Sequence, residues 1–404
     1  MEVSSREKVE LSKGGTVLGG SLILAGTAIG GGMLGLPVLT SAGGFYPAVV
    51  IYILCWLFMT ATGLLFLEVF LWSKDEVNIV SMAKMTLGLP GKIAAWLLYL
   101  FLFYSLTIAY VCGGGGLVKE VFDLSGEKNF PASLGPLIFL LIFAPFVTLG
   151  AKAVDSINRL LMASLILSFL LFVVLGVSHI DLKFLSHFNW PLAFLAAPVV
   201  FTSFGFQGTL PSMINYLDRD HKKVKKAIIW GTLIPLITYI IWEALILGVI
   251  PADQLQQTKE QGLTAVAPFK NVLHIPWIYT VGEFFAFFAL ITSFLGVTLG
   301  LLDFMSDGLK IKKTGKGRLV LSCIVFIPPL IFAMINPSLF LNALHYAGGI
   351  GCALLLGLLP IIMVWRGRYI LKYQSPYSLF GGRITLSLLT LFVVCELVLM
   401  MVKI

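Results

Sequence analysis

Apolar residues fall into long runs along the chain, and charged residues collect in the short segments between them. A helix needs about 20 mostly apolar residues to cross the roughly 30 Å hydrocarbon core of a bilayer. The pattern therefore predicts an all-α polytopic membrane protein, a single integral membrane domain over residues 1–404. The eleven predicted transmembrane helices are Thr16–Val38, Gly44–Trp72, Ile93–Leu117, Leu134–Gly150, Ile157–Val177, Leu192–Ile214, Ala227–Ile250, Ile278–Phe304, Leu319–Met334, Leu339–Trp365 and Ile384–Met401.

Composition agrees with this pattern, since 58% of the residues are hydrophobic and only 12% are charged. An average soluble domain is about 25% charged. The N-terminal stretch MEVSSREKVELSKGG is charged and lacks a cleavable signal pattern, so we expect the first helix itself to direct insertion.

The net charge of +8 is explained by the placement of basic residues. If the N-terminus is cytoplasmic, 22 of the 28 Lys and Arg residues fall in cytoplasmic segments. The densest runs, DRDHKKVKK at 218–226 and KIKKTGKGR at 310–318, then lie on the same face, as the positive-inside rule requires. We therefore expect a cytoplasmic N-terminus, an external C-terminus and no nucleic-acid partner.

Two spans contain residues that disfavour a continuous helix. The first holds GTAIGGGMLGLP at 26–37, and the sixth holds FTSFGFQGTLP at 201–211. Interior glycine costs about 1 kcal/mol and proline about 3 kcal/mol relative to alanine. Gly31 precedes Pro37 by six residues, just as Gly205 precedes Pro211. We predict discontinuous helices at both places, although Gly-xxx-Gly spacing also serves plain helix packing.

These two spans open two sets of five helices, 16–177 and 192–365, followed by an extra helix at 384–401. Because five spans precede it, the second set enters the membrane from the opposite side. The two sets would therefore form an inverted repeat. Broken helices at corresponding positions of two halves indicate the binding site of a secondary transporter, because freed backbone groups there can bind a zwitterion. A channel is the alternative from another class.

Enzyme chemistry is not indicated. The five cysteines lie in or beside apolar runs without CxxC spacing, and no GxSxG, HExxH or GxxxxGK[ST] motif occurs. We expect no enzyme and no bound cofactor beyond a co-transported proton or sodium ion.

Several motifs carry a family resemblance: LAGTAIGGGMLGLP, LEVF at 67–70, FTSFGFQGTLPS, TSFLGVTLGLLDF at 292–304 and HYAGG at 345–349. Together they resemble the bacterial aromatic amino acid permeases of the hydroxy/aromatic amino acid permease family, in particular its tyrosine-specific branch. The resemblance implies a leucine-transporter type fold with five-plus-five inverted repeats and an eleventh helix. It also implies cation-driven uptake of an aromatic amino acid across the bacterial inner membrane. Tyrosine is preferred here, and tryptophan, phenylalanine or another neutral amino acid is the alternative.

On this basis, residues around the two breaks are assigned as hypotheses. The N–H groups assigned to the substrate carboxylate are those of Gly30, Gly31, Gly32 and Met33. The carbonyl groups assigned to the ammonium are those of Ala25, Gly26 and Phe201. The side chains assigned to an aromatic pocket or a phenolic hydroxyl are Phe204, Phe206, Phe294, Ser203, Gln207, Tyr104 and Tyr110, with Gly205 at the break itself.

The coupling ion is left open. Thr292 and Ser293 match the place where sodium-coupled members of this fold put two hydroxyl ligands, and oxygen ligands suit a hard cation. The family resemblance instead implies protons. In that case Glu243, an acidic residue within the seventh span, is our first choice for the titrating group.

Overall fold

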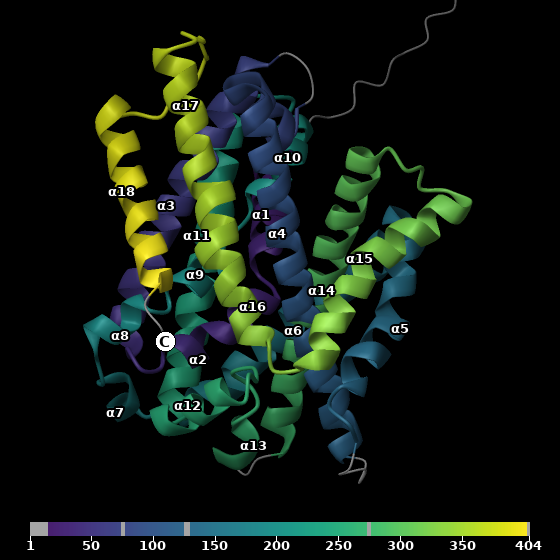
Figure 1. Cartoon of the computed structure of the whole chain (residues 1–404). Coiled ribbons are helices and arrows are strands. Elements are labelled where there is room, and N and C mark those ends of the chain that lie inside the picture. The colour runs from purple at the N-terminus through teal and green to yellow at the C-terminus, as the bar shows by residue number, and fades with distance from the viewer. Residues whose placement is uncertain (1–14, 74–76, 125–129, 273–275, 402–404) are drawn as a thin grey trace, which may run out of the picture.

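The computed structural model describes residues 15–73, 77–124, 130–272 and 276–401. Within these ranges the chain is helical and has no β-strand, as expected for an all-α protein (Figure 1). The elements are α1 (Val17–Ala28), η1 (Gly31–Gly35), α2 (Leu36–Thr40), α3 (Phe45–Trp72), α4 (Ile79–Leu124), α5 (Leu134–Leu149), α6 (Ala151–Gly176), η2 (Val177–His179), α7 (Leu182–Leu185), α8 (Trp190–Phe194), α9 (Ala197–Ser203), η3 (Gln207–Thr209), α10 (Leu210–Tyr216), α11 (His221–Val249), α12 (Ala252–Glu260), α13 (Phe269–Val272), α14 (Pro276–Leu309), α15 (Gly315–Ile335), α16 (Phe340–Tyr346), the π-helical η4 (Ala347–Leu358), α17 (Leu359–Tyr369) and α18 (Gly382–Met401).

Among the described residues, eight helices are long and apolar enough to cross a membrane, or nine when α1 and the bent segment Gly31–Thr40 count as one span. The fourth predicted span is the shorter apolar helix α5, of 16 residues. The sixth predicted span, 192–214, is divided among the short helices α8, α9 and α10. A count of eleven continuous helices is therefore not confirmed, because glycine and proline divide the chain into shorter elements there.

Helix α4 begins earlier than the predicted span that starts at Ile93. It includes a first segment from Ile79 and changes direction at Gly88, where φ is 75°. Only glycine adopts this backbone conformation without strain, and Pro90 follows two residues later. The polar and helix-breaking residues in this stretch hid the helix from an argument based on apolar runs.

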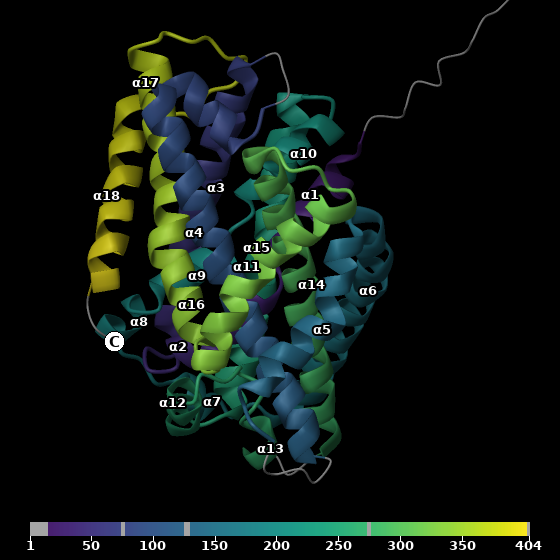
Figure 2. The same ribbon diagram turned by 45° about the vertical axis from the view of Figure 1, so that its right-hand side comes forward.

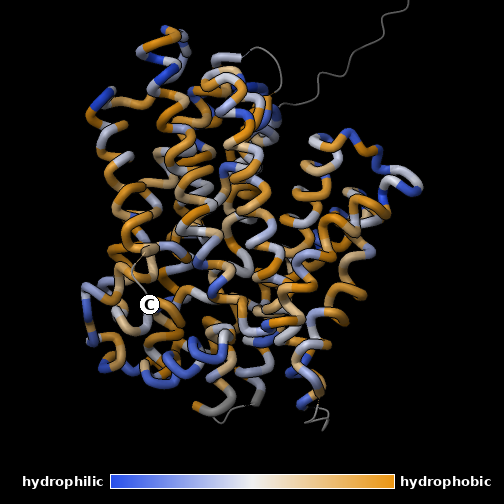
Figure 3. The backbone as a smooth tube through the Cα atoms, in the orientation of Figure 1, coloured by the Kyte–Doolittle hydropathy of each residue, from blue (hydrophilic) through white to orange (hydrophobic). Residues whose placement is uncertain are grey.

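Both basic runs lie at one end of the bundle. The turns between α10 and α11 and between α14 and α15 are at the upper end in Figures 1 and 2, which we call the basic end. Figure 3 shows polar residues at both ends and apolar residues between them. At the basic end, Asp220 caps α11 by accepting the backbone N–H groups of Lys223 and Lys222, which hold the pKa of its carboxyl below the ordinary value.

Helix α11 packs against α3 through apolar surface and through polar contacts, one of which is a cluster around Thr232. The Trp56 indole N–H donates to Thr232 Oγ1 at 3.0 Å, and Thr60 Oγ1 is also 3.0 Å from that oxygen. Thr60 and Thr232 are buried, so these bonds satisfy groups that would otherwise be costly at membrane depth.

A buried ion pair fixes the last helices at the basic end. Arg368 of α17 donates through Nε to Glu68 Oε1 of α3 at 2.6 Å, and its second bond reaches Glu68 Oε2. The side chains are 14% and 2% exposed, respectively. The Leu379 backbone joins both partners, since its N–H donates to Glu68 at 3.1 Å and its carbonyl accepts from Arg368 at 3.0 Å. The pair therefore ties the connection leading to α18 onto the bundle.

Removing the arginine tests how much the Arg368–Glu68 ion pair stabilises the fold. We expect Arg368→Met to destabilise the folded protein by about 3–5 kcal/mol, because it leaves the Glu68 carboxylate buried without its cation. Thermal unfolding of purified protein in detergent measures the effect. Arg366→Met, at an exposed position in the same turn, should change stability by less than about 0.5 kcal/mol. Equal unfolding temperatures for both variants would contradict a stabilising role of the Arg368–Glu68 pair.

Candidate functional site

Two helix breaks meet near the centre of the bundle. Helix α1 ends at Ala28 and helical structure resumes at Gly31, with a bend of 44° between the two parts. Helix α9 ends at Ser203 and the next helical turn begins at Gln207. Each break leaves backbone N–H and C=O groups without intrahelical partners, and inside a membrane these need protein, water or ligand.

Two aromatic side chains of α11 satisfy part of this need. The Tyr239 hydroxyl lies 2.7 Å from the carbonyl oxygens of both Ala28 and Ser203. The Trp242 indole N–H donates to the Met33 carbonyl at 2.9 Å. Both side chains are fully buried. Helix α11 therefore holds the ends of the two broken helices beside each other.

Helix α14 contacts the first break from another side. The Gly31 N–H donates to Ser293 Oγ at 2.8 Å. A Cβ atom added at Gly31 would lie 2.8 Å from the Tyr110 ring and 3.1 Å from Leu290, so only glycine fits without displacement. In the described ranges the next amide, that of Gly32, donates no hydrogen bond. Since Gly32 also lines a cavity, its N–H is available to a ligand.

This cavity has a volume of about 460 Å³ and lies between α1, α4, α6, the α9 break, α14 and η4. Its size is in the ordinary range for small-molecule sites. It extends to Ile79, the first residue of α4, and thus toward the basic end. The aromatic residues in its wall are Tyr99, Phe103, Tyr110 and Phe206. The polar side chains in its wall are Thr27, Asn158, Thr202, Ser203, Thr209, Thr292 and Ser293.

Within the described part of the chain, no charged side chain is among the residues that line this cavity. A ligand's ionic groups would therefore have to be bound by backbone dipoles and hydroxyl groups at the breaks. This suits a molecule without net charge, in which a carboxylate and an ammonium balance each other, and whose remaining surface is aromatic.

The structure brings eight of the residues expected at the site to the cavity wall. They are Gly26, Gly32, Tyr110, Ser203, Gly205, Phe206, Thr292 and Ser293. Ser203 Oγ donates to the Val199 carbonyl at 3.0 Å, and Thr292 Oγ1 donates to the Phe288 carbonyl at 2.8 Å. Both hydroxyl oxygens keep acceptor capacity for a ligand or a cation.

The other expected residues lie outside the cavity lining. They are Ala25, Gly30, Gly31, Met33, Tyr104, Phe201, Phe204, Gln207, Phe294 and Glu243. Gln207 shows the reason most clearly: its Oε1 accepts the Phe206 N–H, and its Nε2 donates to the Met59 carbonyl and to Thr62. The Gln207 amide therefore stabilises the second break through these hydrogen bonds and does not face the cavity.

Three aromatic residues expected at the site, Phe201, Phe294 and Tyr104, instead contact neighbouring helices. Phe201 packs against Phe58 with ring centroids 5.2 Å apart, and Phe294 meets Phe139 edge-on at 5.1 Å. Tyr104 donates its hydroxyl to the Ile324 carbonyl of α15 at 2.8 Å.

Asn158 is a wall residue that sequence reasoning missed. Its Oδ1 atom is buried and has no hydrogen-bond partner among the described residues, and the side chain lines the cavity. Asn158 is the second residue of the predicted span Ile157–Val177, so the apolar pattern placed it at the end of a helix and away from any site. A polar amide within the helix was the signal, but only packing shows which neighbours it faces.

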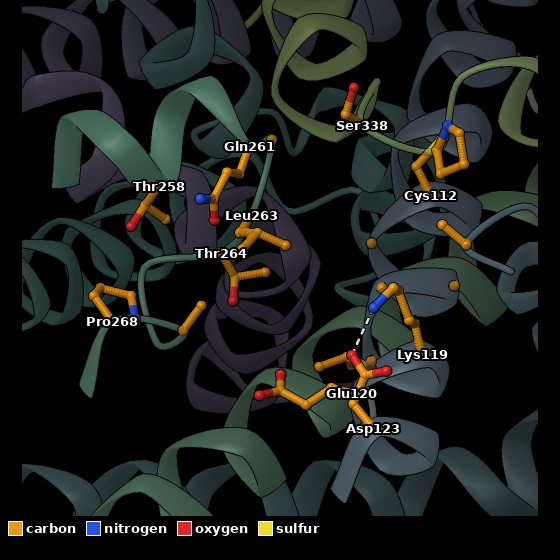
Figure 4. Close-up of a pocket in the computed structure, with 18 of the residues that line it drawn as sticks. Cys112, Lys119, Glu120, Asp123, Thr258, Gln261, Leu263, Thr264, Pro268 and Ser338 are labelled. Carbon is orange, nitrogen blue, oxygen red and sulfur yellow. Dashed lines mark hydrogen bonds and ion pairs between the residues drawn. The ribbon is translucent and has the colours of Figure 1, made fainter. Parts of the chain in front are cut away.

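A second cavity of about 580 Å³ lies toward the opposite end of the bundle (Figure 4). It contains charged groups, including Lys119, whose Nζ is 2.6 Å from Asp123 Oδ2. Leu290 separates the two cavities, because it neighbours both Gly31 beside the first and Gly113 in the wall of the second. Phe340 also contacts Gly113, and both side chains are at most 1% exposed. The central cavity is therefore closed toward this end.

Glu243 lies behind the first break and is fully buried. Tyr52 of α3 donates to its Oε2 at 2.6 Å, and Thr40 at the end of α2 is bonded to its Oε1. Thr40 Oγ1 also lies 2.8 Å from the Leu36 carbonyl oxygen. The carboxyl thus joins α2, α3 and α11 without touching the cavity.

Comparison with known proteins identifies the fold and then the family. The fold resembles that of MhsT, seen in a crystal structure in complex with L-phenylalanine, with a TM-score of 0.66 over 94% of this chain and 98% of that chain, at 15% sequence identity. The description "Tryptophan/tyrosine permease family" applies to the family model that matches residues 13–401. The chain belongs to this family of membrane permeases, which confirms the resemblance noted in its motifs.

Two relatives from Haemophilus influenzae cover almost the whole chain. Tyrosine-specific transport system 1 is 36% identical over 378 residues, 91% of this chain and 92% of the relative. A tryptophan-specific transport protein is 32% identical over 405 residues, 96% of each.

Substitution at the first break should separate a binding role from packing in general. We expect Gly31→Leu to abolish binding of an aromatic amino acid, because its side chain would displace Tyr110 and Leu290 at the edge of the cavity. Gly116→Leu is the matched control, since a Cβ there meets nothing within 4 Å. Calorimetry with tyrosine on both purified variants measures the affinities. Wild-type affinity in Gly31→Leu would leave only a packing role for this glycine.

Proposed function

We propose that this permease imports an aromatic amino acid, with tyrosine as the main substrate, by cation-coupled secondary transport. The observation that carries the proposal is the uncharged, aromatic-walled cavity at two helix breaks. Family membership and the tyrosine-specific relative support the substrate class.

The proposed architecture has eleven crossings: the eight long helices, the bent α1–α2 span, α5 and the divided segment α8–α10. Residues 16–177 and 192–365 would form the two inverted repeats of a leucine-transporter type fold, with 384–401 as an added helix. The likeness to MhsT supports this fold, and the positions of the two breaks fit its symmetry.

In the proposed complex, the substrate carboxylate accepts the free Gly32 N–H, and the ammonium faces carbonyl groups at the end of α1. The aromatic ring lies between Tyr110 and Phe206, where stacked or edge-on contacts stabilise it. Ser203 and Asn158 are the polar wall groups available to a phenolic hydroxyl. Because phenylalanine lacks this hydroxyl, it would leave such a partner unsatisfied.

We place the basic end in the cytoplasm of a bacterial inner-membrane protein, following the distribution of Lys and Arg. The N-terminus is then cytoplasmic and the C-terminus periplasmic. The central cavity extends toward the basic end and is closed toward the other end. With the basic end in the cytoplasm, this is an inward-facing conformation, in which the cavity opens toward the cytoplasm.

Reporter fusions test the orientation. We expect a reporter joined after Lys226 to behave as cytoplasmic and one joined after Gln257 as periplasmic, because α11 separates the two positions. Paired alkaline phosphatase and fluorescent protein fusions give opposite signals on the two sides. The reverse pattern would invert the topology and the proposed direction of the cavity.

For coupling, we propose protons with Glu243 as the titrating group. A hydroxyl has a single proton, so Thr40 cannot donate to both the Leu36 carbonyl and Glu243 at once. Both contacts become hydrogen bonds if Glu243 is protonated and donates to Thr40. Its burial without a cationic partner among the described residues also favours the neutral form.

Sodium is the second candidate, and a different observation favours it. Thr292 and Ser293 line the cavity opposite the first break, and hydroxyl and carbonyl oxygens are suitable ligands for a hard cation. Ser293 Oγ already accepts the Gly31 N–H, so it would contribute its remaining lone pair.

Uptake into proteoliposomes distinguishes the schemes. With a pH gradient alone and the membrane voltage clamped, we expect wild type to accumulate labelled tyrosine and Glu243→Gln to bind tyrosine without gradient-driven accumulation. The double variant Thr292→Val with Ser293→Ala should keep its pH-driven accumulation. Accumulation driven by sodium at equal pH, lost in that double variant, would overturn proton coupling. Competition by unlabelled tryptophan and phenylalanine ranks the substrates in the same assay.

A further inference from the structure

A buried carboxyl group lies on the last helix, far along the chain from the two breaks. Glu396 of α18 is only 2% exposed. Its Oε1 atom is buried and has no hydrogen-bond partner within the described part of the chain. Acidic residues at membrane depth are costly and are functional candidates by default.

Among the residues that the structure describes, the surroundings of Glu396 contain no cation. The thiol of Cys55 of α3 lines the same small cavity as Glu396. The other titratable neighbour is Cys395 beside it, while α8 and α9 carry no titratable side chain. The basic residues of α17 lie in its last turn, where Arg368 is paired with Glu68. Within the described ranges an ionised carboxylate would therefore have no countercharge.

A small cavity adjoins the carboxyl group. Its volume is about 90 Å³, and Glu396 lines it together with residues of α3, α8 and α9, including Cys55, Phe194 and Ala197. This space is large enough for one or more water molecules. Leu54 and Phe194 in its wall are each 38% exposed on the outer surface of the bundle. The carboxyl thus has room for an O–H partner and a route to the surface.

Contacts on the same face of α18 lead to the second broken helix. Phe392 is four residues before Glu396, hence one helical turn away. Its ring stacks on Phe201 of α9, with centroids 5.8 Å apart, and on Phe58 of α3 at 4.9 Å. Helix α9 continues to Ser203 in the wall of the central cavity. A change at Glu396 can therefore act on α9 through direct packing.

We propose that Glu396 is a proton-binding site, separate from the substrate cavity and from Glu243, that is occupied while α18 packs against α9. The bound proton removes the cost of an unpaired charge and permits close contact between these helices. Loss of the proton ionises the carboxyl and drives this part of α18 away from α9.

Chemical labelling tests for the proton directly. An apolar carbodiimide reacts with protonated carboxyl groups and enters from the lipid or detergent phase. On purified wild type without substrate at neutral pH, we expect an adduct on Glu396, quantified by peptide mass spectrometry, which decreases as the pH rises. Glu68 is the matched control, because its carboxylate is paired with Arg368 and should stay unmodified. Labelling of Glu396 that is independent of pH would overturn the proposal.

Infrared spectroscopy gives a second measurement that requires no reagent access. Wild type should show the C=O stretch of a protonated carboxyl group that is missing in Glu396→Gln, and Glu243→Gln should retain that band. Identical carbonyl bands in wild type and Glu396→Gln would show that no proton is held there. Neither measurement involves transport, so failure of the proposed function would not affect the outcome.

Discussion

The main constraint on this structure is that two interrupted helices leave backbone polar groups inside an apolar bundle. Such groups need partners because no bulk water is present at membrane depth. The Tyr239 hydroxyl lies within hydrogen-bond distance of the carbonyl groups of Ala28 and Ser203, one from each broken helix, and donates to one of them at a time, while Trp242 donates to the Met33 carbonyl. Gln207 fulfils the same purpose inside the second break. Backbone groups that these side chains leave without a partner, such as the Gly32 N–H, define where a ligand can bind. The site therefore depends on the position of α11, which supplies Tyr239 and Trp242.

Charged side chains are kept away from the cavity that the breaks create. The buried carboxyl groups of Glu68, Glu243 and Glu396 are each at a helix contact: the first with a cation, the second with two hydroxyl groups, the third beside a small cavity. A zwitterionic ligand then meets backbone dipoles, while any proton that drives transport is bound elsewhere. Under the proposed proton scheme, coupling between them would pass through the packing of α2, α9 and their neighbours, and the charge state of these carboxyl groups would control those contacts.

The two larger cavities also differ in chemistry. The one near the opposite end contains the Lys119–Asp123 pair, whereas the central one has aromatic rings, hydroxyl groups and an amide. Between them lies a thin layer that includes Leu290 and Phe340. Glycines on both sides of it, Gly31 and Gly113, allow this close contact. A passage between the two cavities would have to move apolar side chains of this layer, such as Leu290 and Phe340.

The sequence by itself determined the features that depend on local chemistry. Apolar runs indicate the spans, and glycine with proline indicates the breaks, because these residues change backbone preferences wherever they occur. Residues in the breaks, such as Gly32 and Phe206, were accordingly predicted at the cavity. Only the tertiary structure decided which side chains face it. Gln207 is turned toward Met59, Phe294 packs on Phe139, and Asn158, near the start of the predicted span Ile157–Val177, lies inside α6 and lines the cavity. In a bundle that is apolar on nearly every face, periodicity cannot distinguish a helix surface that meets a cavity from one that meets another helix or lipid.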